Sequence, residues 1–164
     1  MVFVIVASLI IGINATAQAA SSTTQSFSYQ VSEVSEITVS GNPGSLIIST
    51  ATAGSDPTGV SDSSTSYAIT ANGTNKKITG QITTGGALPA GVTLKANLLA
   101  TGFGTGGTDV DISDAAVHNL VTGITKAKAS QGSGNTTITY KLDATADAGI
   151  VGPTAIVVTL TITN

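Results

Sequence analysis

The sequence predicts an all-β protein, built as one antiparallel sandwich behind an extended N-terminal arm. Short apolar runs alternate with polar residues at the period of a β-strand and are divided by turn residues, without a long helical period. Hydrophobic residues make up 41% of the chain, but charged residues only 9% and aromatic residues 4%, which is not typical of disorder. No repeat recurs at a fixed period, which argues against a solenoid or propeller. We therefore expect an immunoglobulin-like β-sandwich of about seven to nine strands.

Residues 1–19 have the pattern of a signal peptide. Residues 2–13 form an apolar run, which is shorter than the ~20 residues that a membrane-spanning helix needs. Ala17-Gln18-Ala19 then supplies a small-x-small cleavage pattern. No Lys or Arg precedes the apolar run, so the alternative is a retained N-terminal anchor of the kind found in type IV pilins. We expect cleavage after residue 19, secretion to the cell exterior or surface, and no membrane association afterwards.

Residues 25–40, QSFSYQVSEVSEITVS, contain two apolar runs in one phase. Phe27, Tyr29 and Val31 form the first run, and Ile37 and Val39 form the second. Because side chains alternate along a strand, all five would point to the same face of an extended chain.

Glu33 and Ser35 occupy the inward positions between these two runs. A single strand through one core would bury the Glu33 carboxylate, which is costly unless the charge is paired. The apolar face is therefore expected to serve two cores. We predict a donor-strand arm and linker over residues 20–36, and a sandwich domain over residues 37–164 that begins with a strand at 37–40.

The next strands are predicted from alternation and turn chemistry. Leu46 and Ile48 mark a strand, and residues 51–66 form a Gly/Ser/Asp/Thr loop. Residues 67–71 and 78–82 flank Asn72-Gly73, a dipeptide typical of hairpins, so we expect these two strands to pair.

Later strands differ in how clearly the pattern defines them. Residues 92–100, 138–146 and 156–162 alternate strongly, and residues 101–108 form a glycine-rich loop. Residues 109–124 predict one or two short strands, with a helical turn that Ser113 would cap. Tyr140 is a candidate for the tyrosine that anchors the edge of many sandwiches, although an ordinary half-buried tyrosine is the preferred interpretation.

The sequence contains no convincing catalytic constellation. His118 is the only histidine, there is no cysteine, and all six basic residues are lysines. The serines lie almost wholly in turn-rich stretches, so no triad or phosphate clamp can be assembled, and we expect neither an enzyme nor a cofactor. The lysines are scattered and the formal net charge is −3, which argues against nucleic-acid binding.

Asp109, Asp111 and Asp114 follow a glycine-rich stretch and form a weak candidate calcium site, because calcium prefers several oxygen ligands on a bent loop. The spacing matches neither an EF-hand nor a glycine-aspartate repeat. Solvated loop carboxylates without a metal are therefore the preferred interpretation.

Asn72-Gly73-Thr74 and Asn135-Thr136-Thr137 match the acceptor pattern for N-glycosylation. Both asparagines lie in predicted turns, where an acceptor would be exposed.

The order of leader, extended arm and cysteine-free sandwich resembles that of secreted filament subunits of bacteria and archaea. The residues that carry the resemblance are QSFSYQV as the donor strand, with KLDATADAG and AIVVTLTIT as the terminal strands. The similarity is architectural, to TasA-type biofilm fibre proteins and archaeal bundling pilins. It implies that Phe27, Tyr29 and Val31 are donated to a neighbouring copy, giving a head-to-tail homopolymer. Chaperone–usher pilins usually carry a disulfide, and this chain has no cysteine.

The alternative is a monomeric adhesin or carbohydrate-binding module on the cell surface. Residues 24–40 would then be one bent or bulged strand of their own domain. Its partners would be surface glycans or other filaments, and sugar stacking would require exposed aromatic side chains. The candidates downstream of the leader are Phe27, Tyr29, Tyr67, Phe103 and Tyr140.

Overall fold

The computed structural model describes residues 20–164, so the predicted signal peptide lies outside the described residues. The chain divides into two units, Met1–Val31 and Ser32–Asn164. In the described part of the first unit, residues 20–31 form no helix or strand, and all their side chains are exposed. Over residues 20–164, no helix is long and apolar enough to cross a membrane.

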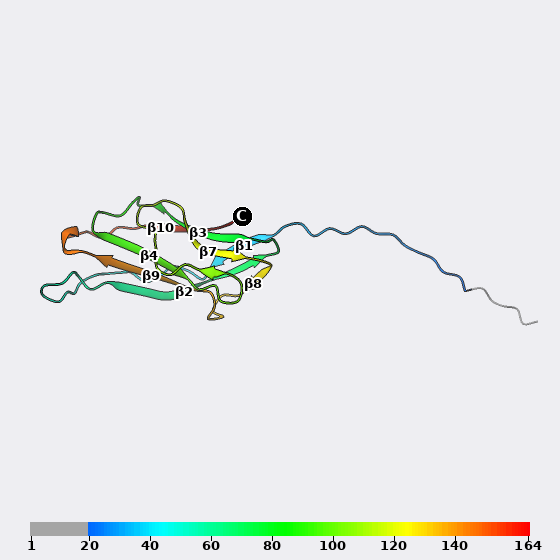
Figure 1. Ribbon diagram of the computed structural model, residues 1–164, viewed down its shortest axis with the longest axis horizontal. Helices are drawn as coiled ribbons and strands as arrows, with labels where there is room; N and C mark the ends of the chain where they lie inside the picture. The colour runs from blue at the N-terminus through cyan, green and yellow to red at the C-terminus, as the bar shows by residue number, and fades with distance from the viewer. Residues whose placement is uncertain (1–19) are drawn as a thin grey trace, which may run out of the picture. The chain divides into compact units, whose positions relative to one another are not determined.

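The second unit is an antiparallel β-sandwich (Figure 1), which confirms the predicted all-β class. One sheet has the order β1-β2-β9-β4-β6, with β8 also paired to β2. Its strands are β1 (Ser35–Val39), β2 (Val60–Ala71), β9 (Thr137–Ala144), β4 (Val92–Leu98), β6 (Val110–Asp111) and β8 (Ala127–Ala129). The other sheet has the order β10-β3-β7-β5. Its strands are β10 (Val157–Thr163), β3 (Lys76–Thr84), β7 (His118–Ile124) and β5 (Thr105–Gly106).

The hydrophobic core lies between the two sheets. Ile69 and Leu98 of the larger sheet pack in one buried cluster with Ile78 and Leu120 of the smaller sheet. Each such side chain contributes roughly 1.5–3 kcal/mol when it is removed from water. Because the inward positions are mostly Ile, Leu and Ala, the fold is stabilised by aliphatic packing with few aromatic residues.

The Asn72-Gly73 turn connects the two sheets and does not form a hairpin. β2 pairs with β1, β8 and β9, whereas β3 pairs with β10 and β7. The predicted pairing of residues 67–71 with 78–82 is therefore wrong, although both strands exist. Each strand buries its inward face in the shared core, so the connection crosses the sandwich from one layer to the other.

The predicted strand at Leu46 and Ile48 is absent. Both side chains are half-buried and Ile47 between them is exposed, as the alternation implies, but the segment joins no ladder. Pro43, which has no backbone N–H to donate, precedes this segment.

β2 begins at Val60, inside the stretch that was predicted as loop. The polar residues of this half hide its strand character, and its pairing with β9 is irregular after Asp62. There the Asp62 carboxylate accepts hydrogen bonds from Ser64 N at 3.0 Å and Ser64 Oγ at 2.6 Å. Such side-chain bonds to a nearby backbone are the kind of local interaction that competes with a regular ladder.

The expected strands within residues 109–124 are present as β6 and β7, but the expected helical turn is absent. Ser113 does not cap a helix, because its Oγ accepts a hydrogen bond from Leu94 N at 2.8 Å and so ties the loop to β4. The short strand β8 carried no periodic signal and was not predicted.

The tyrosine that is hydrogen-bonded to a neighbouring loop is Tyr67, not Tyr140. The Tyr67 hydroxyl donates to the Leu99 carbonyl at 2.6 Å, and the ring meets Phe103 edge-on at 6.3 Å between centroids. Burial raises the pKa of both tyrosines, so both stay neutral in ordinary buffers.

Candidate functional site

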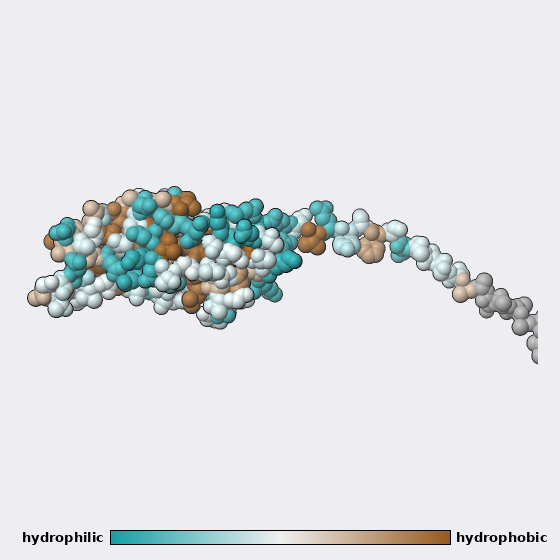
Figure 2. Space-filling model, in the orientation of Figure 1, coloured by the Kyte–Doolittle hydropathy of each residue, from teal (hydrophilic) through white to brown (hydrophobic). Residues whose placement is uncertain are grey.

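The arm residues form an exposed apolar stripe. Phe27, Tyr29 and Val31 are 86%, 87% and 81% exposed, and they belong to no strand. Figure 2 shows hydrophobic groups on this extended segment among polar ones. Large apolar side chains with this exposure and period 2 are typical of a strand that lacks its partner.

The edge strand β10 has an incompletely covered inward face. Val158, Leu160 and Ile162 point toward the core but are only half-buried. In the adjacent strand β3, Ile78 and Ile82 are almost completely buried. Among the strands of residues 20–164, β10 pairs with β3 alone, so its other backbone edge is open to pairing with another strand.

The edge strands of the two sheets, β1 and β10, contact one another on the same side of the sandwich. Val39 on β1 is 49% exposed and Val157 on β10 is 50% exposed. This side of the sandwich therefore combines two edge strands with incompletely covered apolar side chains.

The first residues of the sandwich unit are fixed by Asn72. Its Oδ1 accepts a hydrogen bond from Val34 N at 2.7 Å, and its Nδ2 donates to the Ser32 carbonyl at 2.8 Å. Glu33, between these two residues, forms an ion pair with Lys76 at the start of β3. The carboxylate that the sequence left without a partner is therefore paired, and β1 starts two residues later, at Ser35.

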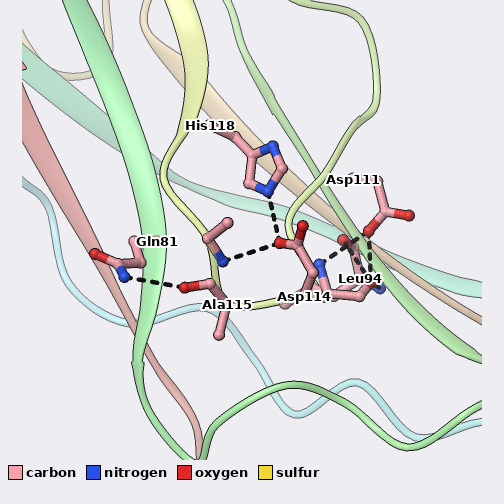
Figure 3. Close-up of polar contacts among 8 residues, drawn as sticks. Gln81, Leu94, Asp111, Asp114, Ala115 and His118 are labelled. Carbon is pink, nitrogen blue, oxygen red and sulfur yellow. Dashed lines mark hydrogen bonds and ion pairs between the residues drawn. The ribbon is translucent and has the colours of Figure 1, made fainter.

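The three candidate calcium ligands do not converge. Asp111 accepts hydrogen bonds from Ser113 N at 2.9 Å and Ser113 Oγ at 2.6 Å. Asp114 accepts from His118 Nε2 at 2.6 Å and from Ala116 N at 2.9 Å (Figure 3). Within residues 20–164, no three His, Cys, Asp or Glu side chains are grouped closely enough to hold a metal.

These hydrogen bonds lower the pKa values of the Asp111 and Asp114 carboxyl groups. The Ser113 hydroxyl and backbone N–H hold the pKa of Asp111 below its usual value. The His118 side chain and the Ala116 N–H do the same for Asp114. Asp109 lies apart, in an exposed turn with a positive φ of 48°. Asp111 and Asp114 therefore serve as caps of their own local turns.

The Asp114 carboxylate orients the imidazole ring of His118. Catalysis would also require a nucleophile or a bound electrophile beside that ring. The hydrogen-bond partner of the His118 ring is Asp114, in an exposed loop. A surface hollow of about 390 Å³ in the described chain has no carboxylate or histidine in its wall. Its lining residues are Thr101, Gly102, Phe103, Thr125, Lys126, Ala127, Lys128, Ala129, Ser130, Ser133 and Asn135.

The two candidate glycosylation sites are in different environments. Asn135 lies in an exposed turn at the rim of that hollow. The Asn72 side chain makes the two hydrogen bonds that fix the start of the sandwich unit, so a glycan there would break them. Asn135 is therefore the better acceptor of the two.

No family model, curated protein or solved structure matches the chain.

Two features of this surface were not foreseen from the sequence. The half-exposed inward face of β10 depends on which strand ends each sheet, and alternation within one strand does not encode that order. The burial of Lys76 depends on its place as the first inward residue of β3. One sequence signal points to this burial: Lys76 lies two residues before Ile78, so the two side chains fall on the same face of a strand.

Proposed function

We propose that this chain is the structural subunit of an extracellular filament. After removal of residues 1–19, the arm of one copy would be inserted as a strand beside β10 of the next copy. The observation that carries this proposal is the stripe of Phe27, Tyr29 and Val31, which alternates like a strand yet is almost fully exposed. The protein would have no catalytic role and no cofactor.

Burial of the stripe gives the driving force. Each of the three side chains contributes roughly 1.5–3 kcal/mol on transfer out of water, before the costs of association and of ordering the arm. Backbone hydrogen bonds between the arm and a sheet edge would fix register and direction.

The properties of β10 make it the preferred acceptor. It has seven residues and one free edge, whereas β5 and β6, at the far ends of the two sheets, have two residues each. The half-buried Val158, Leu160 and Ile162 would be covered by an arm beside them. Donor and acceptor are different surfaces of one chain, so the contact does not close on itself and a fibre grows.

The exposure of the aromatic residues disfavours a carbohydrate-binding module. Within residues 32–164, Tyr67 and Tyr140 are buried and Phe103 packs half-buried against the core. The sandwich therefore presents no fully exposed aromatic platform for a sugar ring, and Phe103 reaches the surface only in the wall of the hollow. The exposed aromatic residues of the described chain are Phe27 and Tyr29, both on the arm.

Deletion of residues 20–31, which keeps the hydrogen bond from Asn72 to the Ser32 carbonyl, tests the proposal. The shortened protein should stay monomeric by light scattering at concentrations where the full mature chain forms filaments visible by electron microscopy. Phe27→Asp should have the same effect, because a charge in a dry groove costs several kcal/mol. Ser28→Asp is the matched control, since Ser28 lies on the opposite face of the extended arm. The Ser28→Asp protein should therefore still form filaments.

A mature wild-type chain that stays monomeric at every concentration would overturn the filament proposal and favour the surface module. Equal loss of assembly in Phe27→Asp and Ser28→Asp would contradict the face-specific insertion of the arm.

A further inference from the structure

Lys76 is a buried lysine on the inward face of β3. Its side chain is only 6% exposed, and it lies in the same strand phase as the fully buried Ile78. A buried ammonium is unfavourable unless it is paired and hydrogen-bonded. The position therefore needs specific partners.

Two side chains meet the Lys76 ammonium. Its Nζ donates a hydrogen bond to Asn164 Oδ1 and forms an ion pair with the Glu33 carboxylate. β3 and β10 pair antiparallel with Thr163 opposite Lys77, and the next residue, Asn164, reaches Lys76 through its side chain. An amine, a carboxamide and a carboxylate therefore meet at one end of the sandwich.

The carboxylate is held in this position by the fold. Ser32 and Val34, on either side of Glu33, are hydrogen-bonded to the side chain of Asn72. Gly73 lies against both the Glu33 carboxylate and the Lys76 stem, and a Cβ at Gly73 would come within 2.8 Å of each. The absence of a side chain at residue 73 therefore leaves the space in which the ion pair forms.

We infer that Lys76 and Asn164 are a modification site, at which an intramolecular isopeptide bond forms between the Lys76 Nζ and the Asn164 Cγ. Glu33 is the proton carrier of this reaction. The inference does not rest on the proposed filament function, because all three residues belong to the sandwich unit.

The reaction is an internal transamidation that needs no oxidant or cofactor. Glu33 takes a proton from the Lys76 ammonium, and the neutral Nζ attacks the Asn164 Cγ. The new bond joins Nζ to Cγ, and the bond from Cγ to Nδ2 breaks. In all, Nζ gives up two protons and the departing nitrogen gains two, so that ammonium leaves and the total charge is unchanged.

The surroundings favour this reaction in two ways. The hydrogen bond from Lys76 Nζ to Asn164 Oδ1 holds nucleophile and electrophile side by side, which raises their effective concentration far above that of free groups. The product also replaces a buried ammonium by a neutral amide. The bond would fasten the edge strand β10 to β3 covalently.

Peptide mass spectrometry of the purified, folded protein tests the inference. We expect one linked peptide that contains both Lys76 and Asn164, lighter than the sum of its parts by one ammonia. The intact mass alone does not suffice, because Asn72-Gly73 is a sequence prone to succinimide formation, which also releases ammonia. Fragment ions that place the junction on Lys76 and Asn164 distinguish the two reactions.

Two variants separate the roles of the residues. Glu33→Gln keeps the size of the side chain but cannot carry the proton, so its Lys76 and Asn164 peptides should be recovered separately. Lys77→Arg changes the neighbouring lysine and should leave the linked peptide intact. Separate peptides from the folded wild type would overturn the inference, and a fully linked Glu33→Gln protein would overturn the role of Glu33.

Discussion

The Tyr67 hydroxyl joins β2 to the residue that follows β4, across the larger sheet. Tyr67→Phe removes the donor to the Leu99 carbonyl and keeps the buried ring in contact with Phe103. We expect a loss of about 1 kcal/mol in the free energy of unfolding, the usual net value of one hydrogen bond. Urea denaturation followed by fluorescence or circular dichroism measures it, and an unchanged midpoint with an unchanged slope would show that water replaces the bond.

The ion-pair partner of Glu33 could not be predicted from the sequence. The sequence marks Glu33 as a polar interruption of an apolar stripe, but its partner Lys76 is 43 positions further along the chain (76 − 33). The pair forms because the residues just before β1 and the start of β3 meet where the β2–β3 connection crosses the sandwich. Only the sheet topology, which alternation does not encode, brings the two charges together.

Among the elements, the strands with strong alternation were predicted, whereas β8 and the first half of β2 were not. β4, β9 and β10 follow the predicted runs closely. The first half of β2 is rich in Ser and Asp, and β8 has three residues, so neither carries a clear period. Asn72-Gly73 was correctly placed in a turn, but local turn chemistry does not determine whether the next strand stays in the same sheet.

Gly106 shows how closely β5 approaches the end of β4. A Cβ at this residue would collide with the backbone carbonyl oxygen of Leu98, which cannot rotate away as a side chain can. We expect Gly106→Ala to lower the free energy of unfolding by about 1–3 kcal/mol, the range for overpacking.

Gly152→Ala is the control for this substitution, because nothing lies within 4 Å of a Cβ there. Its effect should stay within about 0.5 kcal/mol. Thermal unfolding of both variants beside the wild type measures the difference. Equal stability of the two variants would show that β5 can shift away from β4 without cost.

For the whole molecule, composition and strand period were sufficient to predict the all-β sandwich. The incompletely covered edge at β10 was not predictable, because it depends on how ten strands are ordered into two sheets. The arm and this edge are complementary in their chemistry. An extended segment has an exposed apolar stripe, and an edge strand has apolar side chains that are only half covered.

Hydrogen–deuterium exchange tests the pairing of the arm with β10 most directly. The wild-type polymer is compared with the Phe27→Asp monomer. Amides paired in a ladder exchange slowly, whereas those on a free edge exchange fast. We predict that polymerisation slows exchange in two segments, the arm at residues 20–32 and the edge strand β10, and leaves the central strands unchanged. Fast exchange of β10 in the polymer, or protection confined to other edges of the sandwich, would contradict the account.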